Sequence, residues 1–244
     1  MQISFEDVNK MFDEESGLND INIKIDKGII GLLGVNGAGK TTFLRLLTGL
    51  IIPNSGSVDV NDISTSERHF RLNKIGYVSS EDDIPKSLSV RKFIKIYKYM
   101  NSEKKSRINT LAKLLNFKLD SKKKIKDLST GMYQKLKICI TLGYDRDIYL
   151  LDEPTIGLDP VAAKLLAEYL KEIANDKIII YASHILEEVA HLCNKVIIIK
   201  NNEIFINEDV SNWDNIINKQ TEIYYDFYAK NQNIKDVLNG DANE

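Results

Sequence analysis

The stretch Gly34-Val35-Asn36-Gly37-Ala38-Gly39-Lys40-Thr41 decides the fold of this chain. It follows the apolar run 29–33 and precedes residues 42–47, whose apolar side chains recur with helical spacing. A strand, a glycine-rich turn and a helix, in that order, form the setting in which the pattern G-x-x-x-x-G-K-[ST] binds phosphate. Gly34 and Gly39 lack a Cβ atom, so the backbone N–H groups can come close to an anion. The helix start adds partial positive charge at the same point.

This turn predicts a nucleoside triphosphate site. Lys40 is expected to reach the β- and γ-phosphates, and the Thr41 hydroxyl is expected to help hold Mg²⁺. The alternative is a turn that only connects two elements, and the flanking strand and helix favour the nucleotide interpretation. The residues of this segment expected to contact nucleotide are Gly34, Asn36, Gly37, Ala38, Gly39, Lys40, Thr41 and Thr42.

The composition limits the classes of function. At 244 residues, with 43% hydrophobic and 28% charged residues, the chain resembles an ordinary globular protein with a substantial core. The formal net charge of −2 gives no overall attraction to nucleic acid, so no nucleic-acid partner is expected. No stretch approaches the ~18 consecutive apolar residues that cross a bilayer, and residues 1–6 lack the features of a secretory signal. Cys139 and Cys193 lie in apolar patterns and are interpreted as buried thiols, which predicts a cytoplasmic location.

The hydrophobic pattern predicts an α/β fold with an insertion. Residues 1–35 alternate apolar and polar side chains, which is typical of partly exposed antiparallel strands. Between 90 and 142 the spacing becomes helical, so we expect an inserted helical subdomain. Apolar strands that alternate with helices indicate a parallel sheet covered on both faces. The further strands expected are 57–60, 74–78, 148–151, 177–181, 195–200 and 204–206, with helices at 161–174 and 185–192. After about residue 208 the signal fades; residues 221–229 could form a strand, and 231–244 are expected to fray.

Two adjacent carboxylates, Asp152 and Glu153, end the apolar strand 148–151. Neighbouring strand residues point to opposite sides, so the two acids can serve different purposes. Asp152 is expected to orient the Mg²⁺ shell, and Glu153 to polarise the attacking water as a general base. The alternative is an acid that caps a following helix, and the presence of Lys40 upstream favours the functional interpretation.

Two further segments end near elements that could bind an anion. Ser129 and Gly131 precede the helical stretch 133–138, where Ser129 is either a plain N-cap or part of a second anion cradle. His184 follows the apolar stretch 178–183, at a strand end where ligands gather in open α/β sheets. Its imidazole could hydrogen-bond a γ-phosphate or a water molecule, although a lone histidine is more often a polar loop residue.

These motifs, in this order, resemble those of the ATP-binding cassette (ABC) ATPases over about residues 2–205. The run 128–132, which includes Met132, resembles the LSGGQ signature in the form common in export-type cassettes. Residues 150–155 look like the Walker B segment with its catalytic glutamate, and 157–160 resemble the D-loop with Asp159. By the same resemblance, His184 falls at the switch histidine. Phe12 matches the aromatic residue that stacks on adenine.

The resemblance implies a fold and a function. It implies a P-loop NTPase with a RecA-like core, an antiparallel β subdomain and a helical subdomain at about 85–145, together forming an ATPase domain over 1–206. Residues 207–244 would be a partly disordered C-terminal extension. The chain would hydrolyse ATP, with Mg²⁺, to power a separately encoded membrane exporter from the inner face of the membrane. Two copies would pair head to tail, with ATP between Lys40 of one copy and Ser129, Gly131 and Met132 of the other.

One position departs from the family pattern. The strand resembling 75–78 normally leads to a glutamine that contacts Mg²⁺ and couples to the membrane subunit, and Ser80 stands there instead. A serine is shorter than a glutamine, so the metal contact is expected from either Ser80 or Glu81. Two alternatives to transport are a soluble single-cassette ATPase in cofactor assembly and a nucleotide-gated binding module with little turnover.

Overall fold

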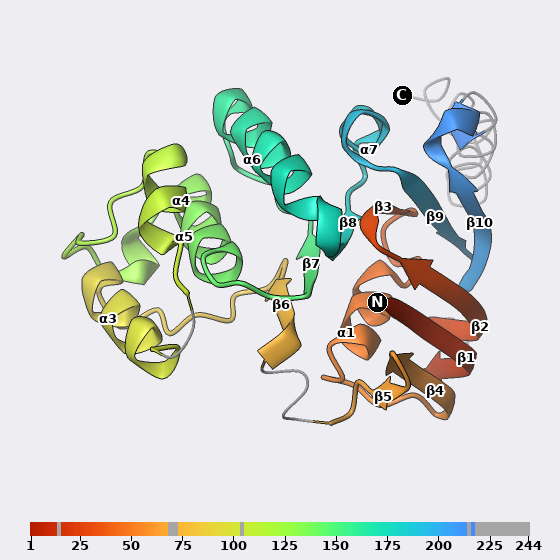
Figure 1. Ribbon diagram of the computed structural model, residues 1–244. Helices are drawn as coiled ribbons and strands as arrows, with labels where there is room; N and C mark the ends of the chain where they lie inside the picture. Colours follow the sequence, from red (N-terminus) through yellow and green to blue (C-terminus); the bar gives the residue numbers. More distant parts are fainter. Residues whose placement is uncertain (14–15, 68–72, 103–104, 214–215, 218–244) are drawn as a thin grey trace, which may run out of the picture.

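The computed structural model describes residues 1–13, 16–67, 73–102, 105–213 and 216–217. Two sheets lie together on one side of the molecule, and a group of helices extends to the other side (Figure 1). The stretches 221–229 and 231–244 discussed above lie outside the described residues.

The smaller sheet is antiparallel and contains strands in the order β2-β1-β4-β5. These strands are β1 (Gln2–Met11), β2 (Gly17–Asp26), β4 (Ser55–Val60) and β5 (Ile63–Ser64). Phe5 pairs with Ile23 on one side and with Val58 on the other, and its ring stacks on Phe43 of helix α1 (Lys40–Leu47) with ring centroids 4.5 Å apart. The alternation therefore correctly predicted antiparallel strands for residues 2–26, although β1 and β2 are longer than expected and residues 28–33 belong to the parallel sheet.

The larger sheet has the order β10-β9-β3-β8-β7-β6. Its strands are β3 (Gly28–Leu33), β6 (Ile75–Val78), β7 (Ile148–Asp152), β8 (Ile178–Ala182), β9 (Lys195–Lys200) and β10 (Glu203–Asp209). All pairs are parallel except β9 with β10. Every residue of β7 and β8 is buried, as continuous apolar strands predict for a sheet covered on both faces. Because β3, β8 and β7 are neighbours, the P-loop (residues 34–41), His184 and Glu153 follow strand ends at one edge.

Adjacent residues of the central strands enter two separate hydrophobic clusters. Leu150 belongs to the cluster formed with β1 and α1, whereas Leu151 belongs to the cluster formed with α6 (Pro160–Ile173) and α7 (Leu186–Leu192). Strand side chains alternate between faces, so one apolar strand contributes to both clusters. The small sheet and α1 thus cover one face of the large sheet, and the helices cover the other.

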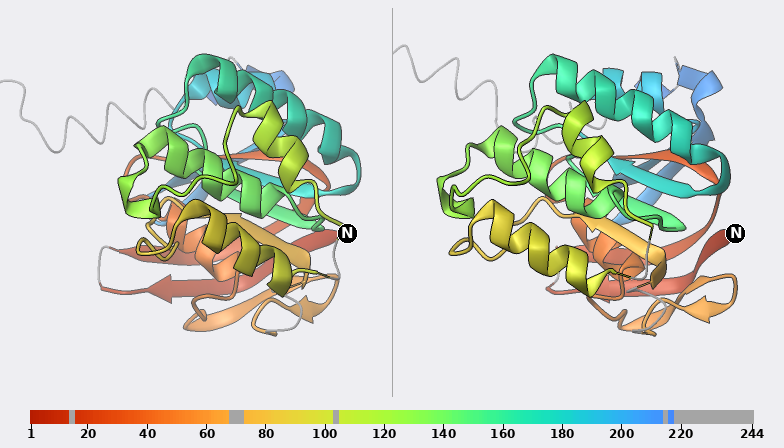
Figure 2. Two further views of the ribbon diagram at one scale, coloured as in Figure 1. Left: turned by 90° about the vertical axis from the view of Figure 1, so that its left-hand side faces the viewer. Right: turned by 60° about the vertical axis from the view of Figure 1, so that its left-hand side comes forward.

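The helical subdomain contains α3 (Val90–Met100), α4 (Ile108–Leu114) and α5 (Thr130–Leu142), which lie together in both views of Figure 2. Serine hydroxyls cap the starts of two of these helices: Ser89 accepts from Lys92 N at 3.4 Å, and Ser129 accepts from Met132 N at 3.3 Å. The short 3₁₀ helices are Ile125–Asp127, Ala174–Asp176 and Val210–Asn212. The α/β fold with an inserted helical subdomain is confirmed.

The expected domain limit after residue 206 falls inside β10, which pairs with β9 as far as Asp209. Ile216 is also fully buried in the core on the helix-covered face. The packed core therefore extends beyond the limit that the fading apolar pattern suggested. The assignment of residues 1–206 and 207–244 to separate regions stays a prediction.

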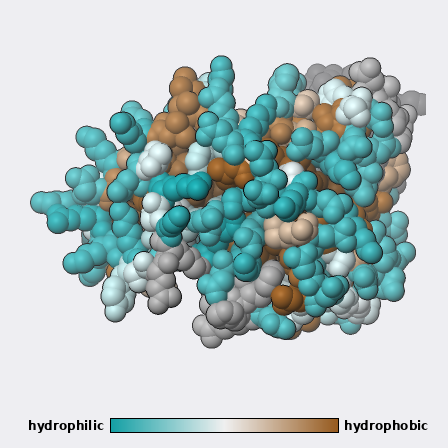
Figure 3. Space-filling model, in the orientation of Figure 1, coloured by the Kyte–Doolittle hydropathy of each residue, from teal (hydrophilic) through white to brown (hydrophobic). Residues whose placement is uncertain are grey.

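The mostly hydrophilic surface and the two buried thiols are as the composition and the apolar pattern predicted. The face in Figure 3 is mostly hydrophilic, with apolar residues in small separate areas. No helix in the described part of the chain is long and apolar enough to span a bilayer. Cys139 and Cys193 are both buried and free, and burial raises the pKa of the Cys139 thiol to about 12.

Candidate active site

A cavity of about 370 Å³ lies beside the P-loop, which we call the nucleotide cavity. Its lining comes from the segment between β1 and β2, the first residue of β2, the P-loop with the start of α1, the end of β7 and the segment after β6. The lining residues are Phe12, Ser16, Gly17, Asn36, Gly37, Gly39, Lys40, Thr41, Thr42, Ser80, Asp152 and Glu153. Most of the residues expected to contact nucleotide are therefore brought together. Ser16 and Gly17 were missed, because nothing in the sequence alone places their loop against the P-loop.

Two of the expected P-loop residues shape the loop and do not line the nucleotide cavity. A Cβ atom on Gly34 would lie 2.8 Å from the Ile199 carbonyl oxygen, and Ala38 is only 6% exposed. Gly37 and Gly39 have φ angles of 83° and 105°, in the left-handed region that glycine adopts without strain. The glycines of the motif thus allow the backbone of the P-loop to adopt left-handed φ angles and to approach neighbouring backbone closely.

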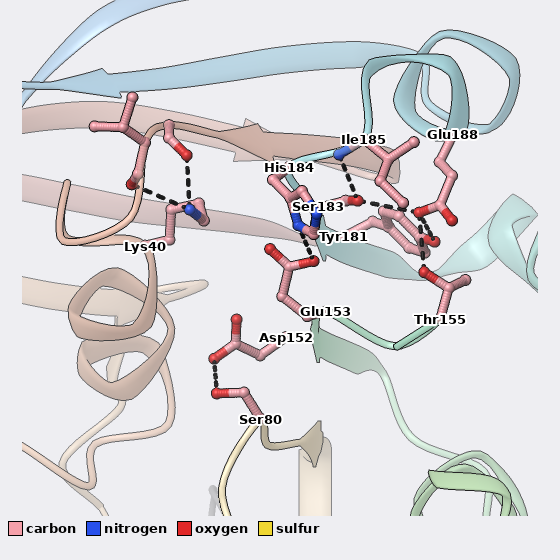
Figure 4. A network of polar contacts seen from close by, with 12 residues as sticks. Lys40, Ser80, Asp152, Glu153, Thr155, Tyr181, Ser183, His184, Ile185 and Glu188 are labelled. Carbon is pink, nitrogen blue, oxygen red and sulfur yellow. Dashed lines mark hydrogen bonds and ion pairs between the residues drawn. The ribbon is translucent and has the colours of Figure 1, made fainter. Parts of the chain in front are cut away.

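Lys40 is buried, and its ammonium folds back onto the P-loop. Its Nζ donates to Gly34 O at 2.7 Å and to Val35 O at 3.3 Å (Figure 4). Burial lowers the pKa of Lys40, while the carboxylates of Glu153 and Asp152 act in the opposite direction. The site therefore holds a desolvated cation that a phosphate group can stabilise.

Three hydroxyl groups converge on Asp152 Oδ2. Ser80 Oγ donates at 2.9 Å, Thr41 Oγ1 at 3.0 Å and Tyr77 OH at 3.5 Å. The Asp152 residue is only 2% exposed, so these hydroxyls replace water around its carboxylate. Burial raises the pKa of Tyr77, and Asp152 raises it further, which keeps this hydroxyl a donor.

The two residues considered in place of the missing glutamine make different contacts. Ser80 contacts Asp152, whereas the Glu81 carboxylate forms an ion pair with Arg45 of α1. The assignment of the metal contact to Ser80 or Glu81 stays a prediction. The basic partner on α1 lies 36 residues earlier in the chain, and the sequence pattern carried no sign of it.

A second buried lysine, Lys137, connects the segment after β6 to the helical subdomain through a hydrogen bond. Lys137 of α5 is 5% exposed, and its Nζ donates to Ser79 O at 2.6 Å. Burial lowers the pKa of Lys137, and nearby Asp83 opposes the shift. Sequence reasoning missed this residue, although a lysine directly between the apolar residues Leu136 and Ile138 was a usable signal.

Glu153 and His184, which were expected separately at two strand ends, form a close pair that the sequence did not predict. His184 Nδ1 lies 2.9 Å from Glu153 Oε2, and the Glu153 side chain is 13% exposed while that of His184 is 53% exposed. Since a carboxylate accepts, the proton of a neutral imidazole lies on Nδ1, and Nε2 is free to accept. The φ angle of Glu153 is 49°, in the left-handed region. Surrounding contacts must therefore stabilise this backbone conformation.

The residues of the signature segment lie in a different cavity of about 460 Å³, which we call the signature cavity. Its lining residues are Asn116, Phe117, Lys118, Ser121, Ser129, Gly131, Met132, Lys135, Gly157 and Asp159, none of which lines the nucleotide cavity. A Cβ atom on Gly131 would lie 2.2 Å from Gly157 O, so only glycine allows this approach of the two loops. The plain N-cap expected at Ser129 is present, and its exposed hydroxyl also borders the cavity.

Asp159 joins the D-loop to the signature helix. Its carboxylate accepts from Ala162 N at 2.8 Å, as the N-cap of α6, and from Lys135 Nζ at 3.1 Å. These two contacts, with the backbone contact first, lower the pKa of Asp159. His191 lines a third cavity between α6 and α7, and His69 lies outside the described residues.

The fold and the site together define a P-loop nucleotide-binding protein with an inserted helical subdomain. A family model described as ABC transporter matches residues 18–156, which is more than half of the chain. The chain belongs to the ABC transporter family. Within that family it is an ATP-binding subunit and a transport ATPase, as its motifs predicted.

Similar proteins agree with this assignment. The chain is 32% identical to the ABC transporter ATP-binding protein NatA of Bacillus subtilis, with 83% of this chain and 87% of the relative covered. It is also 32% identical to the lantibiotic transport ATP-binding protein SrtF of Streptococcus pyogenes, with coverages of 88% and 93%. A solved ATP-binding subunit of an ABC transporter superposes with a TM-score of 0.78 at 22% identity, covering 91% of this chain and 94% of that one. A dimeric ATP-binding cassette bound to ADP and Pi gives a TM-score of 0.74 at 21% identity, with 85% and 98% covered.

Proposed function

We propose that this transport ATPase works as a head-to-tail pair that powers a separately encoded membrane exporter. The observation that carries the proposal is the presence of two half-sites on one chain. The nucleotide cavity holds Lys40 and Glu153, the signature cavity holds Ser129 and Gly131, and the two cavities share no lining residue. A site that needs both halves would form between two copies, each supplying one half.

The chemistry of the two halves is complementary. Lys40 and the P-loop amides would bind the triphosphate from one side. The capped start of α5, with the exposed Ser129 hydroxyl, would meet the γ-phosphate from the other copy. Closure of the two halves would exclude water and strengthen these electrostatic contacts. Phe12, which is 56% exposed at the mouth of the nucleotide cavity, would stack on the base.

Glu153 would act as the general base, because its carboxylate lines the nucleotide cavity. His184 would orient that carboxylate through Nδ1, leaving Nε2 to accept a hydrogen bond from the attacking water or to contact the γ-phosphate in its protonated form.

The oxygen atoms around Asp152 fit Mg²⁺. The hydroxyls of Thr41 and Ser80 each lie within hydrogen-bond distance of the Asp152 carboxylate, and Mg²⁺ prefers one or two carboxylates plus phosphate oxygens and water. When bound there, Mg²⁺ would neutralise charge on the β- and γ-phosphates.

Replacing Ser80 with alanine is expected to raise the Mg²⁺ concentration for half-maximal nucleotide binding by roughly threefold to tenfold, as for one lost hydroxyl contact. Fluorescent ATP binding during a Mg²⁺ titration measures this shift without requiring turnover. The matched control is Glu81→Gln, which breaks the ion pair with Arg45 and should leave the Mg²⁺ dependence unchanged. The reverse result, with Glu81→Gln shifted and Ser80→Ala unchanged, would assign the metal contact to Glu81.

Replacing Ser129 with arginine is expected to block dimerisation, because a long charged side chain would fill the exposed signature cavity. Light scattering after size exclusion, on Glu153→Gln with ATP and Mg²⁺, should give twice the monomer mass of 27.8 kDa. The same protein with Ser129→Arg should remain monomeric. Ser87→Arg is the matched control, since Ser87 is exposed and lines neither cavity. A Ser129→Arg protein that dimerises like the control would overturn the shared site.

We further propose an integral membrane permease as the partner, with this chain held at the inner face of the membrane. Support comes from relatives named for lantibiotic transport and Nod factor export. These names favour transport over the alternative of a soluble ATPase in cofactor assembly. The test is purification of the tagged chain from detergent-solubilised membranes of its own source cells. Recovery of a multi-span protein is expected, and recovery only from the soluble fraction would contradict the proposal.

A further inference from the structure

Glu188 lies in the first turn of α7, outside the nucleotide cavity, and its side chain accepts three hydrogen bonds. Its Oε2 accepts from Tyr181 OH at 2.8 Å, Ser183 Oγ at 3.0 Å and Thr155 Oγ1 at 3.1 Å (Figure 4). The donors come from β8, from the loop after β8 and from the loop after β7. One carboxylate oxygen therefore contacts both β8 with its following loop and the loop after β7, which are neighbours in the sheet but distant in the chain.

The three donors are placed next to the two proposed catalytic side chains. Ser183 directly precedes His184, and its Oγ also accepts from Ile185 N at 3.1 Å, so it fixes the backbone on both sides of the histidine. Thr155 follows Glu153 by two residues. Glu188 thus holds the backbone that carries His184 and the backbone that carries Glu153 from a single point.

The backbone of Glu153 needs such support. Its φ of 49° is unfavourable for a residue with a side chain, and such a conformation persists only where surrounding contacts enforce it. Glu153 N donates to Ala182 O at 2.9 Å, and Gln134 Nε2 donates to Pro154 O at 2.8 Å. The Thr155 contact with Glu188 secures the next residue along the same loop.

A carboxylate suits this position better than an amide. All three hydroxyls donate to one oxygen, and a charged carboxylate oxygen accepts hydrogen bonds more strongly than a neutral amide oxygen, while the NH₂ group of a glutamine cannot accept at all. Burial raises the pKa of Tyr181, and the neighbouring Glu188 adds to the rise, so the phenol remains a donor. Glu188 also borders a cavity of about 520 Å³ between α6 and α7, where water can replace a lost contact without collapse of the fold.

We infer that Glu188 is a positioning residue for ATP hydrolysis, which fixes Glu153 and His184 relative to each other by holding Thr155 and Ser183 through one carboxylate oxygen. The inference rests on the proposed roles of Glu153 and His184. Glu188 does not line the nucleotide cavity, so its effect falls on the alignment of the pair and leaves the binding of ATP unchanged.

Glu188→Gln is expected to lower kcat by roughly tenfold to a hundredfold, as for a small misplacement of a catalytic group, with KM for ATP within about twofold of wild type. The matched control is Glu187→Gln, the exposed neighbour on the same helix, which should keep the wild-type kcat. Steady-state ATPase kinetics and thermal unfolding are measured on each variant. A kcat for Glu188→Gln equal to that of Glu187→Gln would overturn the inference, as would a rise in KM that accounts for the whole loss.

A double-mutant cycle separates positioning from a general structural role. Ser183→Ala removes one donor and should lower kcat in the same direction, with KM unchanged. In the Glu188→Gln background, Ser183→Ala should cause little further loss, because both changes break one network. Losses that multiply would overturn the inference. If Glu188→Gln does not fold, the same cycle is made with Thr155→Val and Ser183→Ala, which remove donors and keep Glu188.

The failure of this inference is distinguishable from the failure of the proposed function. If Glu153→Gln is inactive while Glu188→Gln behaves like Glu187→Gln, only the positioning role of Glu188 is overturned. If Glu153→Gln hydrolyses ATP at the wild-type rate, the proposed catalytic pair is wrong, and the inference built on it is overturned as well.

Discussion

Replacing Glu153 with glutamine is expected to lower ATP hydrolysis by about 10²–10⁴-fold, the usual contribution of a general base. Glutamine keeps the size of the side chain and can remain near His184, so the nucleotide cavity should stay intact. ATP affinity is therefore expected to change by less than about threefold. Phosphate release at saturating ATP and Mg²⁺ measures the loss, and binding of fluorescent ATP measures the affinity.

The control for this substitution is Glu187→Gln, which removes an exposed carboxylate from α7. It should leave hydrolysis at the wild-type rate. A Glu153→Gln protein that retains a third or more of wild-type hydrolysis would contradict the assignment of Glu153 as the base.

Replacing Lys40 with methionine is expected to weaken ATP binding by roughly tenfold to a few hundredfold. Hydrogen bonds from a charged donor contribute about 1.5–3 kcal/mol, and each 1.4 kcal/mol is tenfold in affinity. Hydrolysis should fall with binding, because Lys40 is expected to contact the reacting phosphates. Isothermal titration with ATP and Mg²⁺ measures the affinity directly.

The stability of Lys40→Met should not fall in parallel. Burial lowers the pKa of Lys40, so removal of this desolvated charge offsets part of the cost of leaving the Gly34 and Val35 carbonyl oxygens without their donor. The matched control is Lys24→Met on β2, where the lysine is exposed. Equal ATP affinity for the Lys24→Met and Lys40→Met proteins would contradict the P-loop assignment.

The fold could be predicted from the sequence because its strands and its motif are local signals. The runs 148–151 and 178–181 are apolar throughout, and such runs are typical of strands buried on both faces. The P-loop pattern fixes a strand, a turn and a helix within a few residues. Asp152 and Glu153 directly follow the apolar run 148–151, so the sequence predicted their position at a strand end. The structure places both in the lining of the nucleotide cavity.

The supporting contacts could not be predicted, since they depend on how distant segments pack. Lys137 lies 58 residues from the Ser79 carbonyl that it contacts, and Arg45 contacts Glu81 from helix α1. Glu188 differs from these two, because it contacts Ser183 and Tyr181 from five and seven residues away. A carboxylate one helical turn after His184 was a visible signal, but only the packing of Thr155 shows that it serves both loops.

The central claim is that one copy supplies Lys40 and its partner supplies Ser129 to the same nucleotide. Mixing Lys40→Met protein with Ser129→Arg protein tests this most directly, because a mixed pair contains one intact site. Each variant alone should be nearly inactive, and the equimolar mixture should regain ATPase activity together with ATP-dependent dimers. A mixture that stays as inactive as its two components, while wild-type protein diluted equally remains active, would contradict the shared site.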